Sequence, residues 1–158
     1  MSNIGFSDHN HHNCIVDGMA AVEAQCSESG LKFTPIRRRV LEILLEEHRA
    51  LGAYEILDIL RKDGMGSQPP VAYRALDFLS QNGFVHKIER LNAFVACSHP
   101  DSSHAPTFMI CRLCHSVAEG VAGPDMGELT QSASEAGFQI EQVVVEAEGI
   151  CPKCQDTV

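Results

Sequence analysis

Two Cys-x-x-Cys units, Cys111–Cys114 and Cys151–Cys154, constrain this chain more than any other feature. Together they supply four thiolates, the number and kind of donor that a tetrahedral structural zinc site takes. The 36 residues between the units exceed the roughly 15–20 of a small zinc ribbon. A folded segment, which we expect to be a strand, a helix and a strand, must therefore return the second pair to the first. Disulfides or a redox dithiol are the alternative, but a redox motif is expected to open a helix in a thioredoxin-like pattern.

Composition narrows the class of protein. The chain has 158 residues and is 44% hydrophobic, which allows one ordinary domain or two small ones. No apolar run approaches the ~18 residues of a membrane span, and the N-terminus lacks the pattern of a secretory signal. Seven cysteines, an odd number, occur with clustered histidines and favour metal binding over a disulfide framework. We therefore expect a cytoplasmic protein without a membrane partner.

The charge is unevenly distributed. The net charge is −9, but residues 1–97 carry 10 Lys and Arg against 12 Asp and Glu, whereas residues 98–158 carry 2 against 9. The first part is nearly neutral and has local basic clusters, among them Arg37–Arg39 near the start of a predicted helix. Overall charge therefore does not exclude DNA, although it predicts weak non-specific affinity for it.

Helical periodicity predicts four helices in the first part of the chain. They cover residues 15–29, a segment beginning at Thr34-Pro35, residues 53–61, and a segment that opens at 67–70 and ends at Asn82-Gly83. Residues 1–14 are short of apolar side chains and are expected to form a flexible tail. Whether that tail binds metal is left open; its candidate ligands are His9, His11, His12 and Cys14.

Two alternating segments, 84–89 and 93–97, follow the helices and predict a β-hairpin. Helices followed by such a hairpin describe a winged helix-turn-helix domain over residues 1–97, with the fourth helix in the major groove. Arg74 on the outer face of that helix, with Tyr73 beside it, is the natural base reader because a guanidinium can grip guanine through two hydrogen bonds. A helical domain with a hairpin of no DNA-binding role is the alternative.

The remainder of the chain predicts a smaller domain. Residues 98–105 are polar and are interpreted as a hinge. Strands are expected at 107–110, 117–121 and 138–148, with a helix at 124–136, so that all four sulfurs meet at one end of a sheet. The predicted fold class is α+β: a winged helix-turn-helix domain, then a small α/β domain with a four-cysteine zinc site over residues 106–158.

A second set of metal donors surrounds the hinge: His86, Cys97, His104 and Glu119. Each has an ordinary alternative, such as a surface histidine, a buried cysteine or a solvated carboxylate. The set is spread over 34 positions, and spacing alone does not group it.

Several runs of sequence are similar to a known family. Residues 53–60, 73–79 and 82–87 resemble the ferric uptake regulator superfamily. Phe84-Val85-His86-Lys87 with Cys97, and the two Cys-x-x-Cys units together, resemble its zinc uptake regulator branch. The similarity extends from about residue 15 to residue 154.

The resemblance implies a homodimeric, metal-dependent repressor of zinc uptake genes, with zinc as corepressor and residues 106–158 as the dimerisation domain. It implies two zinc ions per subunit. Their expected ligands are, for the structural site, Cys111, Cys114, Cys151 and Cys154, and, for the regulatory site, His86, Cys97, His104 and Glu119. Tyr54 and Arg74 match residues that contact the operator, an AT-rich inverted repeat in double-stranded DNA.

Other functions remain as alternatives. A thiolate ligand at Cys97 favours zinc over manganese or ferrous iron, but iron, manganese, nickel or peroxide sensing are the nearest rivals in the superfamily. A zinc hydrolase would need an open coordination position and a general base, and no His-Glu-x-x-His signature occurs, so we expect no enzyme and no small-molecule substrate. A zinc-ribbon interaction module would have no specific DNA affinity. His99 and His115 have no predicted role.

Overall fold

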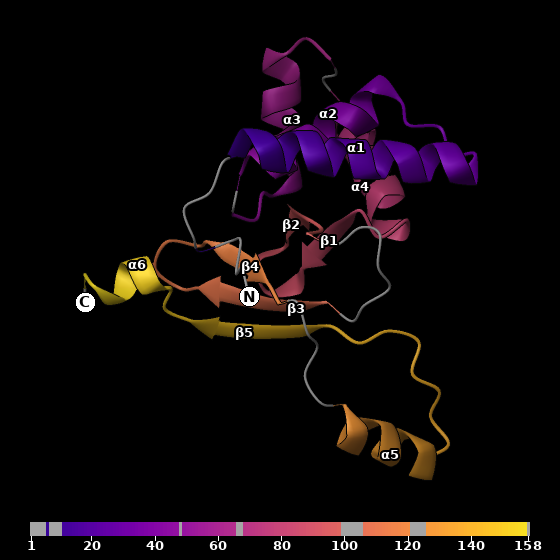
Figure 1. The fold of residues 1–158 in the computed structure, drawn as a ribbon, viewed down its shortest axis with the longest axis vertical. Coiled ribbons are helices and arrows are strands. Elements are labelled where there is room, and N and C mark those ends of the chain that lie inside the picture. The colour runs from indigo at the N-terminus through magenta and orange to yellow at the C-terminus, as the bar shows by residue number, and fades with distance from the viewer. Residues whose placement is uncertain are drawn as a thin grey trace.

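The structure is a computed structural model that describes residues 6, 11–47, 49–65, 68–98, 106–120 and 126–157. Four helices lie together, a two-stranded hairpin lies between them and a three-stranded sheet, and one helix projects away from the rest (Figure 1). No helix in the described ranges combines the length and hydrophobicity needed to cross a membrane.

The helical domain confirms the predicted order of helices. It consists of α1 (His11–Ser29), α2 (Pro35–Glu46), α3 (Ala53–Lys62) and α4 (Pro69–Gln81). The hydroxyl of Thr34 accepts a hydrogen bond from Arg37 N at 3.4 Å, and Pro35 takes the first helical position, so α2 begins where the sequence predicts. The apolar stripes of the helices meet in one core.

The first helix starts earlier than we expected. It begins at His11 rather than Ile15, so residues 11–14 are helical and not part of a flexible tail. The predicted start was placed at the first apolar residue of the helix, and a polar first turn carries no such signal. Extending an existing helix by one turn costs little, because each added residue forms a further backbone hydrogen bond. The rest of the predicted tail, including His9, lies outside the described residues except for residue 6.

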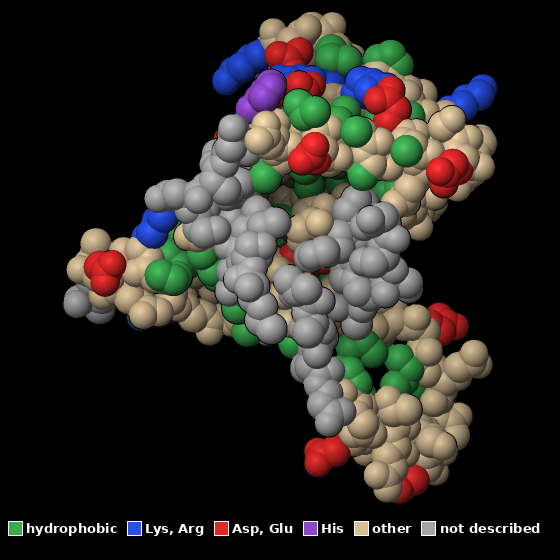
Figure 2. Space-filling view, viewed as in Figure 1, with side chains coloured by type: hydrophobic (Ala, Val, Ile, Leu, Met, Phe, Trp, Pro, Cys, Tyr) green, Lys and Arg blue, Asp and Glu red, His purple; other side chains and the backbone are tan. Residues whose placement is uncertain are grey.

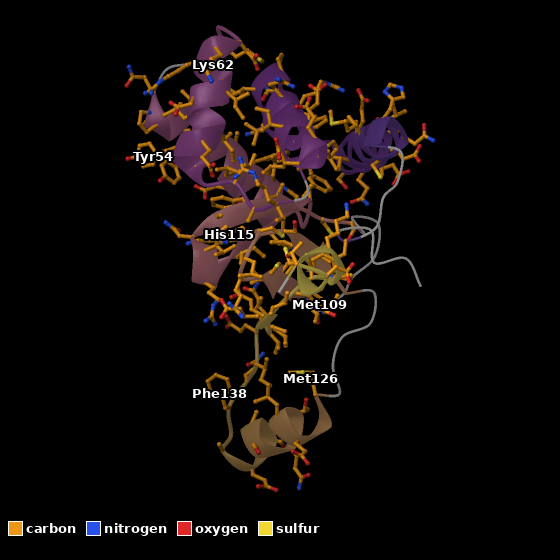
Figure 3. All side chains as sticks on the ribbon, turned by 90° about the vertical axis from the view of Figure 1, so that its left-hand side faces the viewer. Tyr54, Lys62, Met109, His115, Met126 and Phe138 are labelled. Carbon is orange, nitrogen blue, oxygen red and sulfur yellow. The ribbon has the colours of Figure 1, made fainter. Side chains whose placement is uncertain are left out.

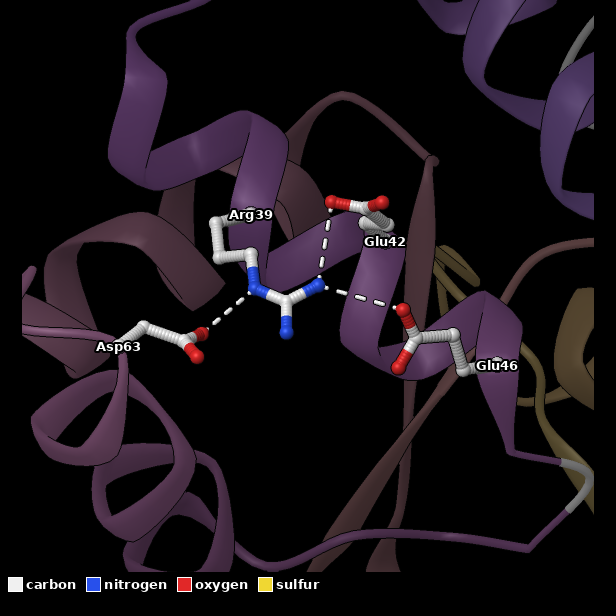
Figure 4. A network of polar contacts seen from close by, with 4 residues as sticks. All are labelled: Arg39, Glu42, Glu46 and Asp63. Carbon is white, nitrogen blue, oxygen red and sulfur yellow. Dashed lines mark hydrogen bonds and ion pairs between the residues drawn. The ribbon is translucent and has the colours of Figure 1, made fainter.

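The basic run at the start of α2 is engaged within the domain. The Arg39 guanidinium contacts Asp63 at 2.7 Å, Glu42 at 3.1 Å and Glu46 at 3.2 Å, joining α2 to the end of α3 (Figure 4). Arg38 pairs with Glu23 of α1. The Arg37 guanidinium lies 3.7 Å from the centre of the Phe78 ring. These arginines stabilise helix packing, and phosphate contact is not needed to explain them.

The hairpin forms the predicted wing. Strands β1 (Val85–Ile88) and β2 (Ala93–Ala96) pair antiparallel, and a 3₁₀ turn, η1 (Glu89–Leu91), joins them. Leu51, in the connection between α2 and α3, bridges to Phe94 of β2. The wing is therefore attached to the helical domain by backbone pairing.

The second domain is a sheet in the order β4-β3-β5, made of β3 (Thr107–Cys111), β4 (Val117–Glu119) and β5 (Val145–Gly149). A tight turn makes β3 and β4 antiparallel, and the excursion through α5 (Gly127–Glu135) makes β5 parallel to β3. A short helix, α6 (Pro152–Gln155), follows.

The last strand is shorter than predicted. Residues 138–144 were expected to belong to a strand over 138–148, but β5 begins only at Val145. A strand needs a neighbour to satisfy its backbone groups. Strand β3 begins at Thr107, opposite Val145, so the described part of the chain gives 138–144 no partner strand.

The two domains share a core. Ile88 and Ala93 of the wing, together with Ala50, pack against Phe108 and Ile110 of β3. Arg49 also bridges to Ser116 beside the first cysteine pair. The wing therefore lies directly on one face of the sheet.

Candidate metal centres and nucleic-acid interface

The structure brings the four cysteines of the two Cys-x-x-Cys units together at one end of the sheet. Cys111 ends β3 and is followed by the turn that carries Cys114, while Cys151 and Cys154 lie at the start and within α6. The four Sγ atoms lie within 4.8 Å of one another, and those of Cys114 and Cys151 are 3.7 Å apart. Zinc with Zn–S bonds of about 2.3 Å would separate its sulfurs by about 3.8 Å. The group fits a tetrahedral zinc ion.

Hydrogen bonds shift the pKa values of the thiols in this group. The backbone amides of Cys151 and Cys114 lower the pKa of Cys111 to about 6; the Cys151 amide lies 3.4 Å from its sulfur. Hydrogen bonding to Cys151, assisted by desolvation, raises the pKa of Cys154 to about 12. The pKa values of Cys111 and Cys154 are therefore shifted in opposite directions within one group of ligands.

A second cluster lies at the junction of the two domains. His86 comes from β1, Cys97 directly follows β2, and Glu119 ends β4 of the second domain. Glu119 Oε1 lies 3.6 Å from His86 Nε2 and 3.8 Å from Cys97 Sγ, and the three donor atoms are within 4.8 Å of one another. Imidazole, thiolate and carboxylate are all zinc ligands, and these separations are close to the ~3.3–3.6 Å between ligand atoms on one zinc ion.

The fourth predicted ligand, His104, lies outside the described residues, as does His99. The structure therefore brings together three of the four residues grouped by resemblance, and a tetrahedral ion would need one more donor. His115 is described: it is exposed in the first cysteine turn, with a left-handed backbone at φ 61°.

Ser98 completes the junction cluster and was missed from the sequence. Its backbone amide and its hydroxyl both lie 2.9 Å from Glu119 Oε2, to which they donate. They hold the carboxylate so that the other oxygen, Oε1, faces His86 and Cys97. Only the position of Ser98 directly after Cys97 could have suggested this role.

The residues predicted to contact DNA are all exposed on the helical domain. Tyr54 lies in the first turn of α3 with 68% of its surface exposed, and Tyr73 on α4 is 44% exposed. Arg74 is exposed beside it, and within the described ranges its guanidinium takes part in no ion pair. Figure 3 shows Tyr54 at the outer edge of the helices, at the opposite end of the molecule from Phe138. All three side chains are available to a ligand.

The fold and these clusters define a winged-helix protein whose domain junction carries a set of metal donors. The chain belongs to the ferric uptake regulator family, whose model matches residues 28–148.

Among its relatives is the zinc uptake regulation protein of Escherichia coli (strain K12), which is 36% identical over 137 residues, 86% of this chain and 80% of the relative. The ferric uptake regulation protein of Staphylococcus aureus is 26% identical over 133 residues, 82% of this chain and 92% of the relative.

Solved structures agree with this placement. A zinc uptake regulator complexed with zinc and DNA superposes with a TM-score of 0.84 at 34% identity, covering 90% of this chain and 96% of that one. The holo form of XcZur superposes with a TM-score of 0.79 at 45% identity, covering 87% of this chain and 96% of that one. The apo form of XcZur superposes with a TM-score of only 0.53 at 44% identity, covering 90% of this chain and 99% of that one. At nearly equal identity, the arrangement of this chain is therefore more similar to the holo form.

Proposed function

We propose that this chain is a zinc-responsive, sequence-specific DNA-binding transcriptional repressor of zinc uptake genes. The single observation that carries the proposal is the cluster of His86, Cys97 and Glu119, which draws ligands from both domains. The relatives named for zinc uptake regulation and the superposition on a regulator complexed with zinc and DNA support it.

The thiolate at Cys97 supports zinc as the sensed metal, since manganese and ferrous iron prefer oxygen and nitrogen donors. The cluster is largely buried: 15% of the His86 side chain and 4% of the Glu119 side chain are exposed. We propose that His104 supplies the fourth donor, giving a regulatory site of His86, Cys97, His104 and Glu119.

Zinc, when bound, supplies a common centre for donors that come from two domains. His86 and Cys97 move with the wing and thereby with α4, while Glu119 is fixed to the second domain by its place in β4 and is oriented by Ser98. Joining them fixes the helical domain on the sheet. Moving such an equilibrium from 1:99 to 99:1 takes a preference of about 10⁴-fold, or about 5.5 kcal/mol.

We assign the other zinc ion to Cys111, Cys114, Cys151 and Cys154, for a total of two per subunit. Four thiolates leave zinc no open position, which suits a permanent structural role. Residues 106–158 would then form a domain that is held together by the ion and serves as the dimerisation domain.

Exposed hydrophobic residues around α5 support a homodimer. None of the side chains of α5 is buried, and Leu129, Phe138 and Val144 are 47%, 67% and 38% exposed. Hydrophobic surface is visible on and near this projecting helix (Figure 2). A second copy covering it would also give residues 138–144 a neighbour.

In the dimer, Tyr54, Tyr73 and Arg74 of each subunit would read one half of an AT-rich inverted repeat. Two half-sites are bound together only when the spacing of the two recognition helices matches the DNA, one helical turn or a multiple apart. Fixing the helical domain on the sheet sets that spacing.

A gel-shift titration tests the proposal. The operator is first selected from random DNA with zinc-loaded protein, and binding is then compared at buffered free Zn²⁺, Fe²⁺, Mn²⁺ and Ni²⁺. We expect saturable, sequence-specific binding at the lowest free concentration with zinc. Stronger activation by one of the other metals would reassign the sensed metal, and metal-independent binding would reject the mechanism.

A further inference from the structure

The wing is attached to the second domain at a second place, outside the junction cluster. Glu146 of β5 holds the 3₁₀ turn at the tip of the wing: its Oε1 accepts a hydrogen bond from Glu89 N at 2.7 Å and its Oε2 accepts one from Arg90 N at 3.3 Å. A carboxylate bound to two amides at the start of a helical turn makes charge-assisted hydrogen bonds.

Glu148, the next residue on the same face of the strand, pairs with the Arg90 side chain. Arg90 donates from Nε to Glu148 Oε2 at 2.9 Å and from Nη2 to Glu148 Oε1 at 3.2 Å. This is the two-point geometry that makes arginine–carboxylate pairs specific as well as favourable. Together, Glu146, Glu148 and Arg90 form what we term the wing latch.

The register of the sheet explains why both glutamates face the wing. Glu146 and Glu148 pair with Phe108 and Ile110 of β3, and paired residues of neighbouring strands point to the same face of a sheet. Phe108 and Ile110 are buried under the wing. Alternation along β5 therefore directs its two carboxylates towards η1.

The junction cluster and the wing latch attach the wing to opposite edge strands of the sheet, β4 and β5. Phe108 pairs with Glu119 of β4 on one side and with Glu146 of β5 on the other, so the two glutamates lie in one row about 9–10 Å apart, two strand spacings. The wing also packs on the face of the sheet between these two places, so polar attachments at both edge strands restrict its rotation over that face.

We propose that the wing latch is a second positioning device for operator binding, in which Glu146, Glu148 and Arg90 hold the helical domain in the orientation that the junction cluster also favours. The inference rests on the proposed function. These are positioning residues: they act through the orientation of α4 and not through contact with DNA bases.

Removing Glu148 distinguishes the positioning role of the wing latch from the effect of net charge on DNA binding. A variant Glu148→Ala is less acidic and frees Arg90, so charge alone predicts tighter DNA binding. The latch predicts the opposite: operator affinity at saturating zinc falls at least about 5-fold, the lower end of typical couplings between sites. Glu141→Ala, which removes the same charge from an exposed position before β5, is the matched control and is expected to bind like the wild type or more tightly.

A charge exchange and a DNA-free measurement complete the test. Arg90→Glu should bind more weakly, and the double variant Arg90→Glu/Glu148→Arg should recover most of the affinity because it restores the pair at unchanged net charge. Amide hydrogen exchange at residues 89 and 90, whose N–H groups donate to Glu146, should accelerate in Glu146→Ala, with or without DNA.

Unchanged or tighter operator binding by Glu148→Ala, or unchanged amide exchange at residues 89 and 90 in Glu146→Ala, would overturn the latch. If the wild type showed no zinc-dependent operator binding while exchange still responded to Glu146→Ala, the latch contact would stand and the proposed function, with the positioning role that rests on it, would fall.

Discussion

Individual cysteines in this chain meet different environments. Cys26 lies in the helical core with 2% of its surface exposed, and burial raises the pKa of its thiol; it is a small buried hydrophobic residue, as its place on the apolar stripe of α1 predicts. Cys111, in contrast, accepts hydrogen bonds from backbone amides that lower its pKa to about 6. Backbone hydrogen-bond donors therefore favour the thiolate at Cys111, whereas burial favours the thiol at Cys26.

The thiol pKa values predict how proton release on zinc binding to the cysteine group changes with pH. Binding converts every ligand to thiolate. The Cys154 proton is therefore released at any pH below about 12, whereas the Cys111 proton is released only below about 6, where that thiol is still protonated. In a Cys97→Ser background, calorimetry in buffers of different ionisation enthalpy should show the proton count rising as pH falls from 8 to 5.5. A pH-independent count would contradict these pKa values.

Arg74 is expected to read a base. Arg74→Ala should cost about 1–3 kcal/mol of operator binding and relax base preference at one position of each half-site. Arg112→Ala, in the first cysteine turn, removes the same charge from the second domain and serves as the control. Competition binding with operators substituted at single positions measures both effects. If specificity were unchanged in Arg74→Ala, another residue would be the reader.

At the scale of elements, the helices and the wing could be predicted well because their signals are local. Thr34 and Pro35 mark the start of α2. The apolar residues that recur at helical spacing in α2, α3 and α4 are the ones buried in the core. The prediction of a strand at 138–148 was wrong for residues 138–144. Alternating apolar residues show that a segment can be buried on one face, but they do not show that a neighbouring strand is present. Strand existence depends on partners elsewhere in the molecule.

The exposed surface of α5 and the segment after it gives a test of the dimer. Phe138→Asp should shift the protein to monomer at concentrations where the wild type is dimeric, because a charge placed in an apolar interface loses its hydration without gaining a partner. Gln139→Asp introduces the same charge one position away on the exposed segment and should remain dimeric. Sedimentation velocity measures both. A dimeric Phe138→Asp variant would place the interface elsewhere.

At the scale of the whole molecule, the two clusters differ in how far the sequence could predict them. The spacing within each Cys-x-x-Cys unit is local, so the cysteine group was predictable from the residues alone. The junction cluster joins β1, the end of β2 and β4, and only resemblance to a family groups His86, Cys97 and Glu119 without the fold. Ser98 and the wing latch depend on how one domain sits on the other and on strand register, which no residue spacing reveals.

We expect the junction cluster, and not the cysteine group, to confer the response to zinc. Operator binding measured against buffered free zinc, for the wild type and for Cys97→Ser, tests it most directly. We expect the wild type to show a steep zinc-dependent increase, and Cys97→Ser to remain a folded dimer with one zinc ion per subunit and to show no increase. Undiminished zinc dependence in Cys97→Ser would show that the junction cluster does not sense zinc.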